Sequence, residues 1–197
     1  IARALPQHSH RANGRVVVAH LGNGASMAAM VNRKCVATTL GFSTIDGLLM
    51  GTRCGNLDPG VILHLMETKG LSVKDMTKLL YKESGLLGVS GISQDMRTLL
   101  ASDKPEAQEA VDLLGSLAAA SGGIDALVFT GGIGEHAAEV RRRVCLLSEW
   151  LGISLNPEAN AQHDIVISAG NSSVDVLVIP TNEEWMMAHH AQTLLTL

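Results

Sequence analysis

VVVAHLGNGASMAAMV, residues 16–31, contains a short apolar run, a glycine-rich turn and a second apolar run in direct succession. The first run, Val16 to His20, is β-branched and apolar, which is typical of a buried strand. Residues 26–31 and 35–40 have the pattern of a hairpin around residues 32–34. The HLGNG turn therefore joins two strands, whereas a nucleotide-binding P-loop needs a helix and a Gly-Lys-Ser/Thr ending.

Two further glycine-rich segments follow along the chain. TGGIGEH, residues 130–136, comes after IDALVF, residues 124–129, which is also typical of a buried strand. GFSTIDGLLMGTRCGNLDPG, residues 41–60, surrounds Arg53 with glycines. Each segment alone is compatible with an ordinary tight turn. Together they predict an oxyanion site, because glycine lets the main chain approach a ligand, successive N–H groups form a concavity, and a guanidinium is a forked, permanent donor.

Composition limits the class of protein. The chain has 197 residues, of which 46% are hydrophobic, enough for the core of one large domain. The net charge is −4 and the 15 Lys and Arg residues are scattered, so charge gives no footprint for nucleic acid. Residues 141–143 are the one basic cluster, RRR, which we interpret as capping or solvating a helix face.

Cysteine usage and hydropathy suggest where the protein works. Three cysteines without CxxC spacing argue against a disulfide framework or a zinc site and favour a reducing compartment, so we expect a cytoplasmic protein. The sequence has no run of about 18 apolar residues and no basic-then-apolar leader, so we expect neither a membrane span nor a signal peptide. The chain starts inside the helix-like IARAL, and we therefore expect it to be a fragment.

Helices alternate with strands along the rest of the chain. Asp58, Pro59 and Gly70 bracket one helix, and Ser72 with Asp75 forms a capping box for a second. His64 lies among apolar neighbours of the first helix and is expected to be packed. Further helices are predicted over 94–101, 105–121, 137–151 and 183–195, a strand over 174–179, and loops over 85–97 and 156–173. This alternation predicts an α/β layered domain with a mixed sheet.

Five motifs resemble, in the same order, the C-terminal half of the acetate kinase family: HLGNGAS, GFSTIDGLLMGTRCGNLDPG, KESGLLGVSGISQDMR, FTGGIGEH and PTNEE. The resemblance runs from about His20 to Glu184. It implies an actin-like, ribonuclease H-like ATPase domain, a mixed β-sheet flanked by helices that holds phosphates on hairpin loops. It also implies that residues 1–197 are the C-terminal nucleotide-binding domain of a two-domain kinase, whose N-terminal domain is absent from this chain.

The implied reaction is reversible, ATP-dependent phosphorylation of acetate to acetyl phosphate, with Mg²⁺. Phosphoryl transfer depends on alignment and charge neutralisation, and a carboxylate acceptor needs no general base because it is already ionised at neutral pH. The implied partners are a small carboxylate and ATP or ADP, and a second copy in a homodimer, with neither nucleic acid nor membrane. The alternatives are a propionate or butyrate kinase and a non-catalytic, actin-like ATP-binding module. We expect this chain alone to turn over little or nothing.

The resemblance also assigns residues to roles. Arg53 would stabilise the transferring phosphoryl group and contact the substrate carboxylate; capping the next helix or pairing with Asp58 is the alternative. Glu183 would be the carboxylate associated with Mg²⁺, and Thr181 with Glu184 matches a capping box. The residues assigned to ATP are His20, Leu21, Gly22, Asn23, Gly24, Asp95, Met96, Arg97, Gly131, Gly132, Ile133, Gly134, Glu135 and His136.

The chain departs from the family pattern at several positions. Most family members have Asn at His136, and many have Pro at Thr44, Ser at Cys54 and Asp at Asn56. The Thr44 position resembles one that lines the acyl pocket, where one methylene discriminates by about 1–3 kcal/mol, so acetate against propionate stays open. The family has roughly two more helical turns near Leu114-Gly115, so either residues are absent there or the helix is shorter.

Overall fold

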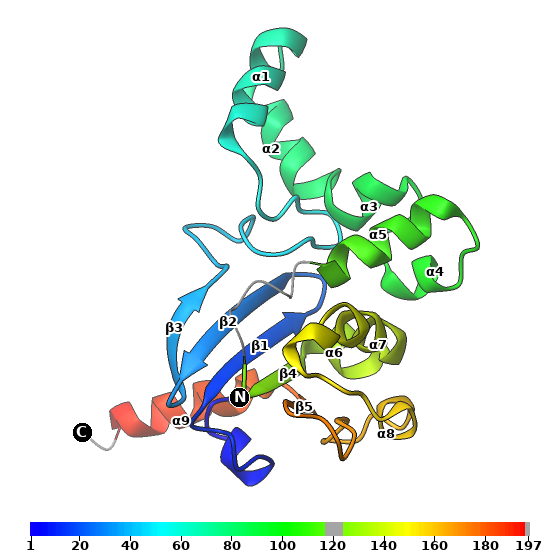
Figure 1. The fold of residues 1–197 in the computed structure, drawn as a ribbon. Coiled ribbons are helices and arrows are strands. Elements are labelled where there is room, and N and C mark those ends of the chain that lie inside the picture. The colour runs from blue at the N-terminus through cyan, green and yellow to red at the C-terminus, as the bar shows by residue number, and fades with distance from the viewer. Residues whose placement is uncertain (117–123, 196–197) are drawn as a thin grey trace.

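The computed structural model describes residues 1–116 and 124–195; the side chains of residues 112–116, 183, 190 and 193 are not described. Its five-stranded sheet has the order β3-β2-β1-β4-β5 (Figure 1). β1 pairs antiparallel with β2 and β2 with β3, whereas β4 runs parallel to β1 and β5. The predicted α/β domain with a mixed sheet is confirmed. The strands are β1 (Arg15–Leu21), β2 (Ala25–Val31), β3 (Lys34–Thr38), β4 (Ala126–Thr130) and β5 (Asp175–Val178).

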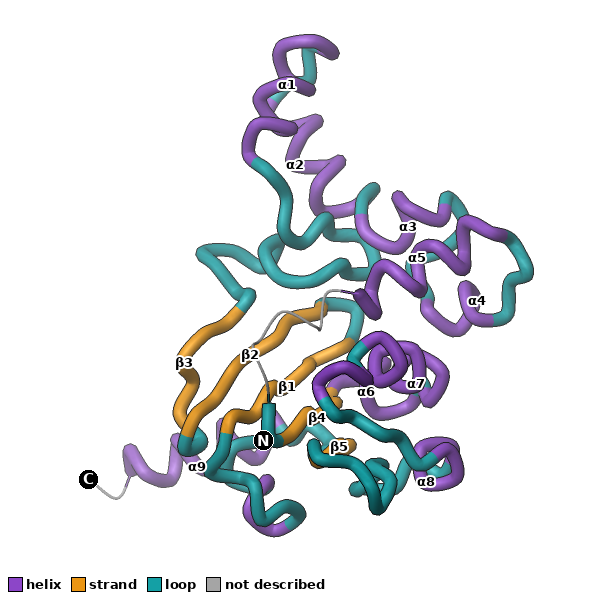
Figure 2. Tube along the Cα trace, viewed as in Figure 1, coloured by secondary structure: helices purple, strands orange, loops and turns teal. Residues whose placement is uncertain are grey.

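Helices surround the sheet and extend beyond it. α6 lies beside β1 and β4 and contacts α7, and α1 and α2 project away from the sheet (Figures 1 and 2). No helix within the described residues is long and apolar enough to cross a membrane. The helices are η1 (Leu5–Gln7), α1 (Pro59–Lys69), α2 (Val73–Lys82), α3 (Gly85–Ser90), α4 (Met96–Leu100), α5 (Pro105–Ser116), α6 (Gly131–His136), α7 (Ala138–Leu147), η3 (Glu149–Leu151), α8 (Pro157–Ala161) and α9 (Glu183–Leu195).

The two faces of the sheet bury separate cores, because successive strand residues point to opposite sides. Leu127 and Phe129 pack on one face in a cluster that includes Val140 and Val144 of α7. Ala126 and Val128 point to the other face, in a second cluster with the N-terminal residues Leu5 and Ala12. β4 is buried along its whole length, which fixes its position between β1 and β5.

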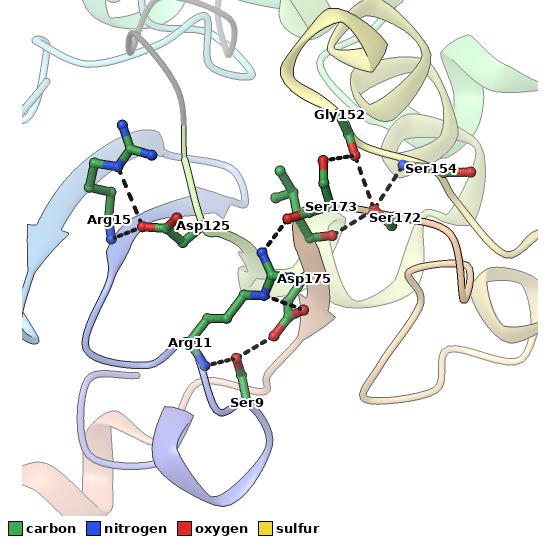
Figure 3. Close-up of polar contacts among 10 residues, drawn as sticks. Ser9, Arg11, Arg15, Asp125, Gly152, Ser154, Ser172, Ser173 and Asp175 are labelled. Carbon is green, nitrogen blue, oxygen red and sulfur yellow. Dashed lines mark hydrogen bonds and ion pairs between the residues drawn. The ribbon is translucent and has the colours of Figure 1, made fainter.

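Polar contacts tie the N-terminal segment to the starts of β4 and β5, as Figure 3 shows. The backbone N–H of Arg15 donates to Oδ2 of Asp125 at 2.7 Å, and Nε of Arg11 lies 3.4 Å from Oδ1 of Asp175. The hydrogen bond from the Arg15 backbone lowers the pKa of Asp125 below its ordinary value. These contacts hold the end of the sheet opposite the glycine-rich turns.

The predicted signals at the first two helices are confirmed. Asp58 accepts a hydrogen bond from the N–H of Gly60, Pro59 opens α1, and Gly70 ends it at a φ of 65°. Ser72 and Asp75 form the capping box of α2. The prediction that His64 is packed is wrong, because α1 buries none of its residues and His64 is exposed.

Several segments differ from the predictions. The glycine-rich stretch after residue 84 forms α3, GGIGEH of the TGGIGEH motif forms α6, and the polar loop after residue 155 contains α8. The helix predicted over 137–151 ends at Leu147, before the separate turn η3. α5 is continuous across residues 114 and 115, and residues 117–121 of the predicted helix lie outside the described part.

The positions of the three arginine side chains at residues 141–143 also differ from our interpretation of a solvated helix face. Arg142 and Arg143 pair with Glu139 near the surface. Arg141, in contrast, is completely buried. The reason is that α7 turns this side chain toward α6 and α8, where backbone carbonyls accept its N–H groups.

Candidate functional site

The turn after β1 and the helix after β4 lie side by side. His20 is aligned with Thr130 in the parallel pairing, so both strands end at the same edge of the sheet. Gly131 has a φ of 79°, and a Cβ atom there would lie 2.9 Å from the carbonyl oxygen of Leu21. A glycine is therefore required at residue 131 for the two segments to approach this closely.

The segment around Arg53 folds over the same turn. The N–H of Gly51 donates to the carbonyl oxygen of Asn23 at 3.2 Å, and a Cβ atom on Gly51 would meet the Asn23 side-chain oxygen at 2.5 Å. Nη1 of Arg53 lies 3.6 Å from the position that a Cβ atom on Gly24 would take. All three glycine-rich segments thus converge, as the sequence predicts.

Arg53 is half-buried and held by neutral groups. Its Nη1 donates to the carbonyl oxygen of Thr44 at 2.7 Å and lies 3.7 Å from the sulfur of Met50. Asp58 does not pair with it, because the Asp58 carboxylate caps α1. Within the described residues no ion pair involves Arg53, so its charge is available to an anion.

A pocket of about 430 Å³ opens beside this turn and extends to α4. Its size suits a small organic ligand. Eight of the residues assigned to ATP line it, and two lining residues were missed: Gln94, which precedes the Asp95-Met96-Arg97 motif, and Ala137, which follows TGGIGEH. The lining is Gly22, Asn23, Gln94, Asp95, Met96, Arg97, Gly132, Ile133, His136 and Ala137.

Asp95 and Arg97 form the α4 side of the pocket. Oδ1 of Asp95 accepts the backbone N–H of Arg97 at 2.9 Å and caps α4, while Nη2 of Arg97 donates to Oδ2 at 2.6 Å. The side-chain hydrogen bond from Arg97 lowers the pKa of Asp95 to about 2, so the carboxylate stays ionised at neutral pH. The Arg97 side chain is 89% exposed, which leaves its planar face open to an aromatic ligand.

The other six residues assigned to ATP do not line the pocket. Leu21 is 3% exposed and packs in the core, and Gly131 and Gly134 are buried in α6. His20 lies between the two turns, with Nε2 3.7 Å from the position of a Cβ atom on Gly22. Gly24 faces Arg53.

Glu135, the sixth of these residues, braces α6. Its Oε1 accepts the N–H of Gly131 at 2.9 Å and, from Thr181, the N–H at 3.0 Å and the hydroxyl at 3.3 Å. These bonds join α6 to the residues that precede α9.

The predicted capping box at the start of α9 is wrong. The side-chain oxygen of Asn182 accepts the N–H of Trp185 at 2.9 Å, whereas the Thr181 hydroxyl is used by Glu135. Glu183 is the first residue of α9, and its side chain lies outside the described part. Among the residues described, no three His, Cys, Asp or Glu side chains form a cluster that could hold a metal ion.

Comparisons with known proteins agree with this arrangement. The model of the Acetokinase family matches residues 3–189. A protein of Rhodopseudomonas palustris (strain TIE-1), "Acetate kinase", is 58% identical over 202 residues, which cover 96% of this chain and 51% of that protein. The chain therefore spans about half the length of the curated relatives it matches.

Solved structures give the same result. The chain is similar to Porphyromonas gingivalis acetate kinase with a TM-score of 0.87 and 39% identity, over 98% of this chain and 52% of that one. It is also similar to a propionate kinase from Francisella tularensis subsp. tularensis SCHU S4, with a TM-score of 0.85 and 39% identity, over 94% and 50% of the two chains. With the family model matching residues 3–189, and with the turn after β1 and helix α6 lining one pocket, this chain belongs to the acetokinase family.

Proposed function

We propose that residues 1–197 form the C-terminal, nucleotide-binding half of an ATP:acetate phosphotransferase, which makes acetyl phosphate and ADP reversibly. The observation that carries the proposal is the position of Arg53 beside Gly24, in the same turn whose Gly22 and Asn23 line a pocket that also has the exposed Arg97 in its lining. ATP in this pocket has its phosphates at the turn and its base at α4. The names of the relatives support this choice of reaction.

In the proposed mechanism, the chain contributes binding and charge. Backbone N–H groups of the turn hold the phosphates, and the Asn23 side chain adds an amide. Arg53 neutralises charge that spreads over the transferring phosphoryl oxygens while the acetate oxygen attacks phosphorus in line with the leaving ADP. The Thr44 carbonyl fixes the guanidinium, so little reorientation is needed during the reaction.

Mg²⁺ is part of the proposal, with Glu183 as the residue that holds it. Mg²⁺ takes one or two carboxylates plus phosphates and waters, so one acid at the start of α9 is a sufficient protein ligand. The bonds from Thr181 to Glu135 keep the start of α9 next to α6, which fits this role. When bound, the ion would offset the negative charge of the phosphates.

The test uses a chimera in which this chain replaces the matched half of the Rhodopseudomonas palustris relative, with acetyl phosphate trapped as the hydroxamate. The expected result is ATP- and acetate-dependent product that Arg53→Ala abolishes. A chimera that binds ATP, measured by calorimetry, but gives no acyl phosphate from any acid would contradict the kinase proposal and favour the non-catalytic module.

Propionate is the second candidate substrate, since one similar structure is named a propionate kinase. Thr44 lies next to Arg53 and is exposed, so a side chain at this position can contact the acyl chain. Ratios of kcat/KM for acetate, propionate and butyrate decide between them.

Location and assembly also remain proposals. A homodimer is supported by the family resemblance alone. The cysteine usage supports a cytoplasmic location, and the scattered charge and the hydropathy of the sequence support the proposal of no nucleic acid or membrane partner. Light scattering of the purified chimera would measure the number of copies, and a monomer at micromolar concentration would contradict the dimer.

A further inference from the structure

Arg141 is a completely buried arginine on α7 that the proposed mechanism does not use. Each of its five N–H groups has an acceptor: Nε donates to Oδ1 of Asn160, Nη1 to the carbonyls of Gly134 and Glu135, and Nη2 to the Asn160 carbonyl and Nδ1 of His163. The distances run from 2.7 to 2.9 Å. No carboxylate among the described residues pairs with it, so the cation is held by dipoles alone.

The two carbonyls that accept from Nη1 belong to the end of α6. The last carbonyls of a helix have no partner within it, and a six-residue helix has few internal bonds to define its orientation. The rigid, planar guanidinium of Arg141 donates hydrogen bonds to the carbonyl oxygens of both Gly134 and Glu135. Gly132, Ile133 and His136 of the same short helix line the pocket, so the bonds from the guanidinium help to set where these residues lie.

Asn160 extends the connection to α8. Its side-chain amide donates to the Ala138 carbonyl at 2.9 Å while its two oxygens accept from Arg141. α6, α7 and α8 are therefore fixed to one another around one buried group.

His163, which follows α8, links the same group to the pocket. An arginine only donates, so Nδ1 of His163 is the acceptor of this contact, at 2.9 Å. The ring stands edge-on to that of His136, with centroids 6.3 Å apart and an angle of 77° between planes. His136 lines the pocket, so the ring contact places His163 against a pocket residue.

The start of α6 adjoins the Gly22 turn, whereas His136 is the last residue of α6 and lines the pocket farther from that turn. We propose that His136 belongs to the nucleoside end of the pocket and that Arg141 and His163 are positioning residues for it, Arg141 through the backbone of α6 and His163 through the ring of His136. This inference rests on the proposed nucleotide site and names residues that touch no ligand. We therefore expect that loss of the hydrogen bonds of Arg141 or of the ring contact of His163 reduces affinity for the nucleoside part of ADP and leaves affinity for its phosphates almost unchanged.

His163 offers the cleanest variants because it is exposed and has a φ of 58°, which Asn and Gly tolerate. His163→Asn keeps an acceptor close to the position of Nδ1 but removes the ring that faces His136. His163→Gly removes both. The matched control is His64→Asn on the exposed helix α1.

The experiment is calorimetric titration of the 197-residue chain with ADP and, separately, with inorganic pyrophosphate, together with thermal melting of each variant. We expect ADP to bind about threefold more weakly to His163→Asn and about tenfold more weakly to His163→Gly, with pyrophosphate affinity within about twofold of wild type. In the His136→Asn background, His163→Asn should cost nothing further, because the ring contact is already lost. Arg141→Lys, which keeps the charge without the fork, should reduce ADP affinity by about tenfold or more.

Every other outcome contradicts one part of this inference or the proposed function itself. Wild-type affinity for ADP in both His163 variants overturns the role of His163, and equal losses for ADP and pyrophosphate in Arg141→Lys show a purely structural arginine. A wild-type chain that binds pyrophosphate and ADP equally well contradicts the nucleoside end itself. A wild-type chain that binds neither contradicts the proposed function, whereas the preceding outcomes leave it standing.

Discussion

Nη1 of Arg53 lies 3.6 Å from the point where a Cβ atom on Gly24 would stand. The turn between β1 and β2 and the segment before α1 are thus in contact, although 29 positions separate residues 24 and 53. A permanent cation next to a glycine-rich turn is the feature from which the proposed phosphate site follows.

The first prediction concerns Arg53. In the chimera, Arg53→Ala should lower kcat by about 10³-fold, in the range of other arginines that stabilise a transferring phosphoryl group, while the Kd for ADP changes by less than about threefold. Steady-state kinetics and calorimetry measure the two effects. A variant with unchanged kcat would show that the guanidinium is structural.

Arg97 should behave in the opposite way. Arg97→Ala removes the exposed guanidinium from the α4 side of the pocket, so the Kd for ADP should rise about fivefold or more while kcat at saturating ATP stays close to wild type. An equal loss of kcat would place Arg97 in the chemical step instead.

The third prediction compares two adjacent glycines. Gly131→Ala places a methyl group 2.9 Å from the Leu21 carbonyl oxygen at a φ of 79°, so unfolding free energy should fall by about 1–3 kcal/mol. Gly132 has open space around it, so Gly132→Ala is the matched control and should change stability by less than about 1 kcal/mol. Urea unfolding measures both, and equal losses would mean that residue 131 is not held against β1.

Glu139 predicts how stability depends on pH. The hydrogen bond from the Arg142 side chain, helped by Arg143, lowers the pKa of Glu139 from 4.5 to about 2. Because the pKa of Glu139 is lowered in the folded state, its contribution to the free energy of unfolding is complete above about pH 4.5. This contribution disappears as the pH falls toward 2.

Glu139→Gln isolates this contribution because it removes the titrating group. The difference in unfolding free energy between wild type and Glu139→Gln should be largest near neutral pH and shrink steadily as the pH falls below about 4.5. A difference that is independent of pH would mean that the ion pairs contribute nothing.

Local signals were predictable from the sequence, as α1 and α2 show. Asp58, Pro59 and Gly70 act on the backbone within a few residues, and so do Ser72 and Asp75. Each cap depends on short-range hydrogen bonds, so its residues can be identified without knowing the rest of the fold.

Elements that depend on distant partners could not be predicted in the same way. α6 is rich in glycine and of low intrinsic helix propensity, and it is braced by Thr181, through Glu135, and by Arg141. The burial of Arg141 follows from acceptors on α6 and α8, so its charge alone suggested a solvated surface. Likewise, the Thr181 hydroxyl donates to Glu135 and does not form the predicted capping box of α9.

The glycine-rich turns located part of the site, and the family resemblance supplied Asp95 and Arg97. Gly22, Asn23, Asp95, Arg97 and Gly132 line one pocket as expected. Which neighbouring residues face the pocket depends on the alternation of side chains along β1 and on the turn of α6, and Leu21 and Gly134 point to the interior instead.

NMR titration of the chain, labelled with ¹⁵N at glycine and arginine, with ADP tests the convergence of these segments most directly. The account predicts that the amides of Gly22, Gly24 and Gly132 and Nε–H of Arg53 shift along one saturation curve, while Gly70 at the end of α1 stays unchanged. Saturable ADP binding that leaves Gly22, Gly24 and Arg53 unshifted would contradict it.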